Sequence, residues 1–380
     1  MPWPLLAAAC LAMFAASSSG TTRAPFLIAM AEDLSTSLPM VANLMAATAI
    51  AWGISSGFAG AAADRYGRRP FLAGGPVGLG IGLVGLSLSQ DIISLALWST
   101  VIGACAGAYT GVLMTEVSSR THDRQRGRAL GWVMAGQSLA LLVGVPLAAW
   151  IGSFIGWRGV NQVSAAIALL TAVALFVTTL RPPEGGAAAR RSSPGMRGVV
   201  TGPVLRLLAM SVGERVSFGL SVVYFATFLQ TTYGLTPAGV ALPLGIVAIG
   251  NILGTVLGGQ AADRLPDRRR TFAMAMVGSG AAALALYLWT PGLAVTVALG
   301  SAFSAFSAMC RPSLMAALAD VPEAVRGTVL GLNVTAACVG WIGAASLGGW
   351  IMAEFGFTAF GPFVMMVAAI AAGLALSGRR

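Results

Sequence analysis

Four ionisable side chains lie inside long apolar stretches of this sequence: Arg23, Glu214, Arg215 and Arg311. A charge surrounded by lipid or apolar side chains is costly, so such residues usually mark a binding or coupling site. Arginine presents a planar fork of N–H donors that fits a carboxylate, and a buried carboxylate can carry a proton. We therefore predict an anion-binding site that uses the three arginines, with Glu214 as the proton carrier.

Three cations against one carboxylate leave this site net positive, which favours an anionic solute over a cationic drug. Glu214 and Arg215 are neighbours on a helix, so they point about 100° apart and are expected not to face the same spot. Arg311 precedes Pro312 and can pair with Glu214 across two helices. Two alternatives stay open: a purely structural Glu214–Arg311 ion pair, and an Arg23 side chain that reaches the membrane surface.

Polar side chains elsewhere in the apolar stretches can complete the site or can join helices by hydrogen bonds. They are Asn43, Gln137, Tyr224, Asn251 and Asn333.

The elements that carry these residues must be membrane helices. Of the 380 residues, 57% are hydrophobic and only 9% are charged, against about 25% charged in soluble proteins. A membrane helix needs about 20 apolar residues. Twelve stretches of that kind run over 4–27, 39–62, 71–89, 93–117, 129–152, 160–180, 204–229, 238–261, 272–290, 293–318, 328–352 and 357–377.

The sequence thus predicts an all-α membrane protein of twelve transmembrane helices. A polar segment, 181–203, separates an N-terminal six-helix bundle, 1–180, from a C-terminal one, 204–380. The first stretch lacks a basic leader and is expected to be an uncleaved first helix.

Arginines in alternate loops predict the orientation, because positively charged loops stay in the cytoplasm. The opposite loops offer only Arg158, so we expect both termini and the central segment to be cytoplasmic, in a bacterial inner membrane. The net charge of +10 is then explained by the arginines of the cytoplasmic loops, and nucleic acid is not an expected partner. The arginines of the cytoplasmic segments are Arg65, Arg68, Arg69, Arg120, Arg124, Arg126, Arg128, Arg181, Arg190, Arg191, Arg197, Arg206, Arg264, Arg268, Arg269, Arg270, Arg326, Arg379 and Arg380.

No cofactor or metal is expected. The four cysteines lie in apolar stretches without metal-ligand spacing, and His122 lies in a loop. The chain has no phosphate-binding loop of the G-x-x-x-x-G-K-[ST] type and no lysine to build one, which excludes ATP-driven pumping by this chain alone.

The two halves repeat each other. Residues 126–131 (RGRALG) align with 326–331 (RGTVLG), 200 positions later, and at the same offset Trp150 meets Trp350 and Gly156 meets Gly356. Such a register implies two parallel repeats about an axis along the membrane normal, with a site between them near the midplane.

A known family shares these features. Residues 60–69 (GAAADRYGRR) resemble the loop signature between helices 2 and 3 of the major facilitator superfamily, and residues 259–264 (GQAADR) echo it. The resemblance covers essentially the whole chain and implies a monomeric, non-enzymatic transporter of small molecules, often coupled to protons. In that family helices 1, 4, 7 and 10 line the central cavity, and all four buried charges fall on this set.

The loop signature implies a gate. Gly60 and Gly67 are expected to allow a close helix approach and a tight turn, and Asp64, Arg68 and Glu116 are expected to form an ion cluster. The second half should hold a weaker version. The remaining residues of the two predicted gates are Arg65, Arg69, Asp263, Arg264 and Asp320.

Two family features are missing or altered. The arginine that proton-coupled members carry early in helix 4 is replaced by Ser99, and the exporters' helix 5 signature is only loosely matched by Gly136, Gly144 and Pro146. The sequence therefore leaves three functions open. These are proton-coupled efflux of a small organic solute, an organic-anion permease working by uptake or exchange, and a membrane sensor or biogenesis factor that transports nothing.

Overall fold

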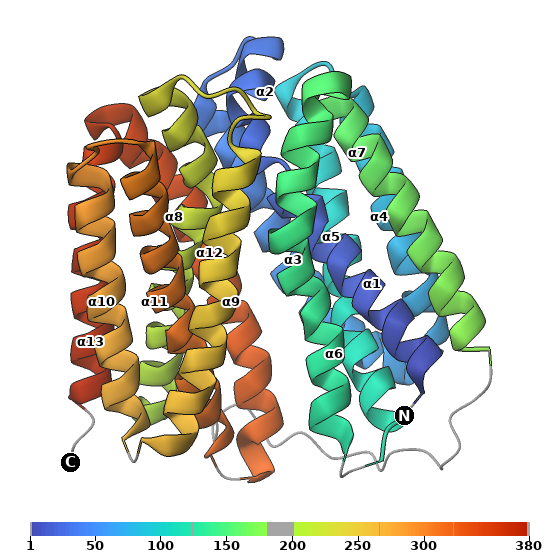
Figure 1. Cartoon of the computed structure of the whole chain (residues 1–380). Coiled ribbons are helices and arrows are strands. Elements are labelled where there is room, and N and C mark those ends of the chain that lie inside the picture. The colour runs from blue at the N-terminus through green and yellow to red at the C-terminus, as the bar shows by residue number, and fades with distance from the viewer. Residues whose placement is uncertain (1, 123–124, 181–200, 266, 322, 378–380) are drawn as a thin grey trace. The chain divides into compact units, whose positions relative to one another are not determined.

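The computed structural model describes residues 2–122, 125–180, 201–265, 267–321 and 323–377, without the side chains of Asp263, Ala319 and residues 323–327. Within these ranges the regular structure is helical and contains no strand (Figure 1). The predicted all-α membrane fold is confirmed. Most of the predicted linker, 181–203, lies outside the described residues. So do Arg124, Arg181, Arg190, Arg191, Arg197, Arg379 and Arg380.

The helices fall into two compact units, and each is described by itself. The first unit comprises Met1–Arg190 and the short segment Thr236–Ala241. Its helices are α1 (Trp3–Thr21), η1 (Ala24–Phe26), α2 (Leu27–Asp33), α3 (Leu38–Tyr66), α4 (Arg69–Leu88), α5 (Ile92–Ser119), α6 (Arg126–Leu139), the π-helical turn η3 (Ala140–Gly144) and α7 (Val145–Thr178).

The second unit comprises Arg191–Leu235 and Leu242–Arg380. Its helices are α8 (Gly202–Tyr233), α9 (Ala241–Arg264), α10 (Arg268–Leu288), α11 (Leu293–Ala319), α12 (Glu323–Phe355), η5 (Phe357–Ala359) and α13 (Phe360–Leu376).

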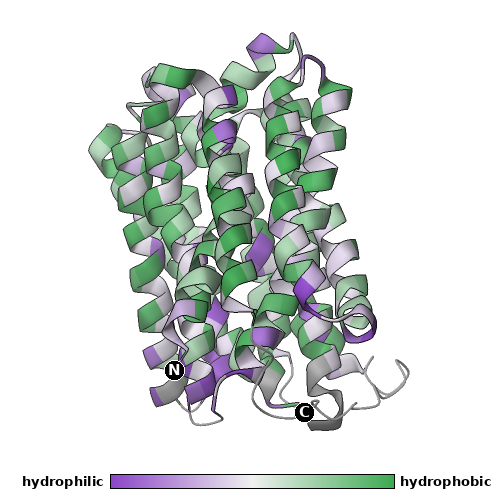
Figure 2. Ribbon diagram, turned by 90° about the vertical axis from the view of Figure 1, so that its right-hand side faces the viewer, coloured by the Kyte–Doolittle hydropathy of each residue, from purple (hydrophilic) through white to green (hydrophobic). Residues whose placement is uncertain are grey.

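Eleven helical segments of the described chain are long and apolar enough to cross a membrane. One of them, Arg126–Thr178, has 53 residues and contains the fifth and sixth predicted spans. Helices satisfy every backbone group internally, which lipid demands. Figure 2 shows hydrophobic residues along the middle of the helices and hydrophilic residues gathered near helix ends.

Glycine divides the long segment. Inside α7, Gly156 has φ 68° and ψ 174°, and Figure 1 shows α7 turning back along itself. Gly356, between α12 and η5, has nearly the same backbone angles, φ 74° and ψ −178°. Positive φ is accessible to glycine and strained for other residues. The backbone angles at Gly156 and Gly356 therefore follow the 200-residue repeat. The break at Gly156 divides the long segment into the two helices expected over 129–152 and 160–180.

Small residues bring helices of each unit into close contact. A Cβ added to Gly103 would lie 2.1 Å from the Thr48 carbonyl oxygen, so α5 packs closely on α3. A Cβ on Gly254 would lie 2.1 Å from the Ala305 carbonyl oxygen, which shows the same for α9 and α11. Without a hydrophobic drive between lipid-embedded helices, such close contact is a main source of their association.

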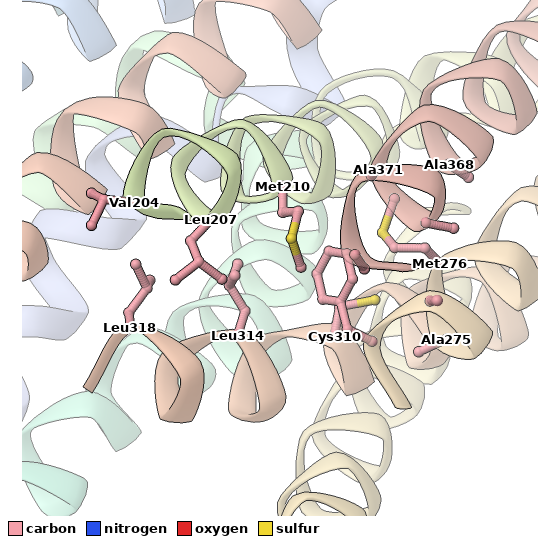
Figure 3. Packing of buried hydrophobic residues seen from close by; sticks show 14 of the residues in the cluster. Val204, Leu207, Met210, Ala275, Met276, Cys310, Leu314, Leu318, Ala368 and Ala371 are labelled. Carbon is pink, nitrogen blue, oxygen red and sulfur yellow. The ribbon is translucent and has the colours of Figure 1, made fainter. Parts of the chain in front are cut away.

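An apolar core joins five helices of the second unit, α8, α10, α11, α12 and α13 (Figure 3). Met210 of α8, Met276 of α10, Cys310 of α11 and Ala371 of α13 are buried in it. Cys310 directly precedes Arg311, and Met210 lies one helical turn before Glu214. The core therefore fixes the helices on which the buried charges sit.

Replacement of Gly156 by alanine tests the break in α7. A Cβ at Gly156 would meet no atom within 4 Å, so the cost comes from the backbone angles alone and should be about 1–3 kcal/mol. We expect Gly156→Ala to lower the midpoint of thermal unfolding of the purified protein. Gly74→Ala is the matched control, because Gly74 lies within α4 and also has open space around it. Equal midpoints for the two variants would contradict this account.

Candidate functional site

Glu214 holds two arginines of the second unit. Its side chain is 1% exposed, and its Oε1 accepts a hydrogen bond from Arg311 Nε at 3.1 Å. Arg215 Nε lies 3.3 Å from Glu214 Oε2. Each carboxylate oxygen therefore faces one guanidinium. With one negative and two positive charges, the cluster carries a net charge of +1 when Glu214 is ionised.

Three helices and an aromatic wall position this cluster. Glu214 and Arg215 lie on α8, and Arg311 lies on α11. The Arg311 guanidinium lies over the Phe218 ring, 4.2 Å from its centroid, and Phe218 packs edge-on against Trp341 of α12 at 5.9 Å. Such stacking fixes the plane of the guanidinium.

The expectation that Glu214 and Arg215 cannot face the same spot is wrong. Their Cα–Cβ bonds do diverge, but the long Arg215 side chain turns back to the carboxylate. Gly340 lets α12 pack closely on α8 at this point, since a Cβ there would lie 2.3 Å from Arg215 Cβ. The structure does bring Glu214 and Arg311 together, and Arg311 Nη2 has no hydrogen-bond partner among the described residues.

Arg23 of the first unit lies apart from any described acidic group. It is 2% exposed, and its Nη1 donates to Ser99 Oγ of α5 at 3.1 Å. The alternative in which Arg23 reaches the membrane surface does not fit this burial. Ser99 is the position where the family resemblance implies an arginine, so a guanidinium does lie there, supplied from the first membrane span.

The five predicted polar residues fall into two groups. Tyr224 donates to the Ala345 carbonyl at 2.5 Å, and Asn251 donates to Ser304 Oγ at 3.3 Å, so both join helices. Asn333 lies 3.6 Å from the Met315 sulfur through Nδ2. The structure records no side-chain hydrogen bond within the described chain for Asn43 or Gln137.

The predicted gate of the first unit is only partly assembled. Arg68 Nη1 lies 3.2 Å from Glu116 Oε2 and donates to Ser119 Oγ at 2.8 Å. Asp64 is exposed and has no ion pair with any described residue, so its expected place in the cluster is wrong. Arg120 takes that place, with Nε 2.6 Å from Glu116 Oε1. Its spacing of four residues from Glu116 is the signal that could have revealed it.

The glycines and arginines around this gate differ in role. Gly67 has φ 86° and forms the predicted turn. A Cβ on Gly60 would meet no atom within 4 Å, so the close approach predicted there is absent from the described chain. Arg65 lies over Tyr66, and Arg69 lies over Phe176 at 4.8 Å.

The second unit has its own version of the gate with a different partner. Asp320 pairs with Arg268, not with Arg264. Arg268 lies 200 positions after Arg68, so the repeat could have revealed it. The side chain of Asp263 lies outside the described residues.

A third charged cluster, which the sequence did not predict, joins the ends of α2 and α4 to α7 in the first unit. Arg158 pairs with Asp33 at the end of α2 and donates to the Ser89 carbonyl at 3.0 Å. Trp157 Nε1 donates to the same Asp33 carboxylate at 3.2 Å. The turn at Gly156 directs both Trp157 and Arg158 towards Asp33. In the sequence, the signal for this cluster was Arg158, the one arginine in the loops of opposite parity. Its partner could not be identified from spacing.

No group of three or more metal-ligating residues is present in the described part of the chain. All four cysteines are free thiols. The ionisable side chains of the described residues gather instead in arginine–carboxylate clusters.

The chain is similar to a family of membrane transporters and to several of its members. The family described as Major Facilitator Superfamily matches residues 9–219 and 207–379. The inner membrane transport protein YdhP of Escherichia coli K12 is 27% identical over 98% of this chain and 94% of its own length. Multidrug resistance protein 2 of Bacillus subtilis is 27% identical over 80% of this chain and 78% of its own. The crystal structure of a D-xylose–proton symporter shares the fold, with a TM-score of 0.81 at 16% identity over 98% of this chain and 97% of that one.

Removal of the shared carboxylate tests the Glu214 cluster. Glu214→Gln leaves two guanidiniums uncompensated and should destabilise the protein by roughly 3 kcal/mol, since breaking a buried ion pair is costly. We expect a lower midpoint of thermal unfolding, and partial recovery when Arg311→Met is added. Arg270→Ala is the control, because that exposed pair with Asp267 should contribute less than about 1 kcal/mol. A loss for Arg270→Ala as large as that for Glu214→Gln would contradict a buried charge cluster.

Proposed function

Because the chain belongs to the Major Facilitator Superfamily, we propose that it is a secondary active transporter for a small organic anion. Members of this family are multi-pass membrane transporters and not enzymes. We propose alternating access as the mechanism, with each of the two repeated units moving largely as a body. The loop arginines support cytoplasmic termini in an inner membrane, and we expect the chain to act as a monomer.

One observation carries the proposal of an anionic solute: two guanidiniums of the second unit share one carboxylate. The surplus positive charge has to be compensated in an apolar environment, and a carboxylate of the solute would do so. Arg311 Nη2 offers a free donor for it. Trp341, which packs against Phe218 and is only half-buried, would supply an apolar surface for the rest of the solute.

Glu214 is the proposed proton carrier. The charged groups that face it are Arg215 on its own helix and Arg311 on α11, and the thiol of Cys310 is also close. Protonation of Glu214 would raise the net charge of the cluster from +1 to +2 and so favour anion binding. Linkage is reciprocal, so a bound anion would favour protonation by the same factor. Proton and anion would therefore bind together and cross the membrane in the same direction.

Proton-coupled efflux is the second candidate. The similarity to Multidrug resistance protein 2 supports it. In an exchanger of this kind, proton and solute compete for one site. A cationic solute would compete with the proton at Glu214, whereas an anionic one would cooperate with it. The sense of proton coupling therefore distinguishes the two candidates.

Transport by the purified protein in proteoliposomes is the test. We expect uptake of labelled carboxylates, such as pyruvate, succinate or citrate, to be accelerated when the outside is more acidic than the lumen. A cationic dye such as ethidium should not be moved. Ethidium export driven by an inward proton gradient, without carboxylate uptake, would overturn the anion proposal in favour of efflux.

Glu214→Gln tests the coupling. Glutamine cannot release a proton, so we expect carboxylate exchange between the two sides to persist while accumulation driven by a pH gradient is lost. Counterflow of the same labelled carboxylate shows whether the variant is folded and active. Arg270→Gln, an exposed arginine outside the cluster, should keep wild-type accumulation. Pyruvate accumulation that still follows the pH gradient in Glu214→Gln would remove Glu214 as the proton carrier.

A further inference from the structure

Arg23 is a buried cation whose charge nothing in the described chain neutralises. It is 2% exposed, and none of the ion pairs of the described residues includes it. Asp33, further along the same membrane span, pairs with Arg158 instead. Arginine stays protonated in proteins, and an uncompensated charge in an apolar environment is expensive. An anion that is not part of the described chain is the natural partner.

The donors that remain free on Arg23 define the shape of that anion. Nη1 donates to Ser99 Oγ at 3.1 Å, while Nε and Nη2 have no partner among the described residues. In a guanidinium the Nε–H and Nη2–H bonds point in parallel from one edge. That edge matches the two oxygens of a single carboxylate and forms a bidentate pair with it.

The surrounding helices hold this edge in place. Arg23 is the N-cap residue of η1 and lies two residues after the end of α1, so its backbone sits at the break between two helical segments. Ser99 is fully buried, and its carbonyl accepts a hydrogen bond from Thr48 Oγ1 of α3 at 3.2 Å. Tyr109 of α5 donates to the Ala12 carbonyl of α1 at 2.9 Å. The frame of α1, α3 and α5 therefore fixes the guanidinium before any ligand arrives, which lowers the cost of binding.

We propose that Arg23, anchored by Ser99, is a carboxylate-binding site of the first unit. This deepens the proposed function, on which it rests for the class of solute. It assigns Ser99 as a positioning residue and Arg23 as the residue that contacts the carboxylate. The site is specific for the fork geometry of arginine and does not accept a lysine as a substitute.

Binding to the full chain in phosphatidylcholine nanodiscs tests the site. The probes are pyruvate, succinate and citrate, with inorganic phosphate and chloride at equal ionic strength. We expect a carboxylate to raise the midpoint of thermal unfolding of the wild-type protein. Arg23→Lys should weaken its binding, measured by isothermal titration, by about tenfold to a hundredfold, since it keeps the charge but loses the paired donors. Ser99→Ala should weaken binding less, and Arg270→Gln should not change it.

A second readout separates a ligand site from a structural role. Arg23→Met removes an uncompensated buried charge, so without ligand we expect it to unfold at a temperature equal to or above that of the wild type. The same variant should show a smaller shift on addition of carboxylate than the wild type, because only the Glu214 cluster can then bind it. A lower midpoint for ligand-free Arg23→Met, with the carboxylate shift retained, would overturn the proposal and leave Arg23 a structural residue. Stabilisation by phosphate alone, or only in nanodiscs that contain phosphatidylglycerol, would overturn the carboxylate assignment.

The outcome is distinguishable from that of the proposed function. Carboxylate transport with unchanged affinity in Arg23→Lys would overturn the site and leave the transporter proposal standing. Carboxylate binding that depends on Arg23, without transport of the same carboxylate by the wild type, would support the site and overturn the transporter proposal.

Discussion

Glu214 holds two guanidiniums at once, and the packing of the second unit around it follows from that pairing. A charge within a membrane-spanning helix needs a partner, because desolvation costs more than any single hydrogen bond returns. α12 packs closely on α8 beside this pairing, because Gly340 lies where a Cβ would collide with Arg215 Cβ. Arg311 reaches the carboxylate with its guanidinium plane set by Phe218. Helix contacts and charge pairing therefore depend on each other, and the pairing still leaves one positive charge in surplus.

The internal sequence repeat is matched closely in backbone angles but less closely in ion pairs. Gly156 and Gly356 adopt nearly the same positive-φ backbone angles, which favour a residue without a side chain. The ion pairs of the two gates diverge more. Arg68 pairs with an acid 48 positions later, and Arg268 pairs with one 52 positions later. A difference of four residues is close to one helical turn, so the acid stays on the same face of its helix. The two halves therefore keep the glycine of the turn at the same repeat position, whereas the acidic partner of the ion pair stays only on the same face of its helix.

Hydropathy and the position of charges were enough to predict the membrane-spanning helices and the Glu214–Arg311 pair. They were not enough for contacts that depend on the path of a long side chain. Helical spacing predicts which face a residue leaves from, but the Arg215 side chain turns back to the carboxylate beside it. The same limit explains why Arg120 takes the place expected for Asp64 beside Glu116. The Asp33–Arg158 pair joins residues 125 positions apart, and no local pattern connects them.

Ser99 shows that a side chain can occupy a place in the fold although it belongs to a different position in the sequence from the one expected. By resemblance, an arginine is expected there on the fourth helix, and its absence in the sequence argues against a charged site at that place. The Arg23 guanidinium nevertheless lies against Ser99 Oγ, although it is attached 76 residues earlier. A serine is small enough to leave room for the incoming guanidinium and polar enough to accept its hydrogen bond, and both conditions are needed for the charge to stay buried there. Whether a site has lost its charge can thus be judged only from the guanidiniums that neighbouring helices bring to it, and not from the residue at the aligned position.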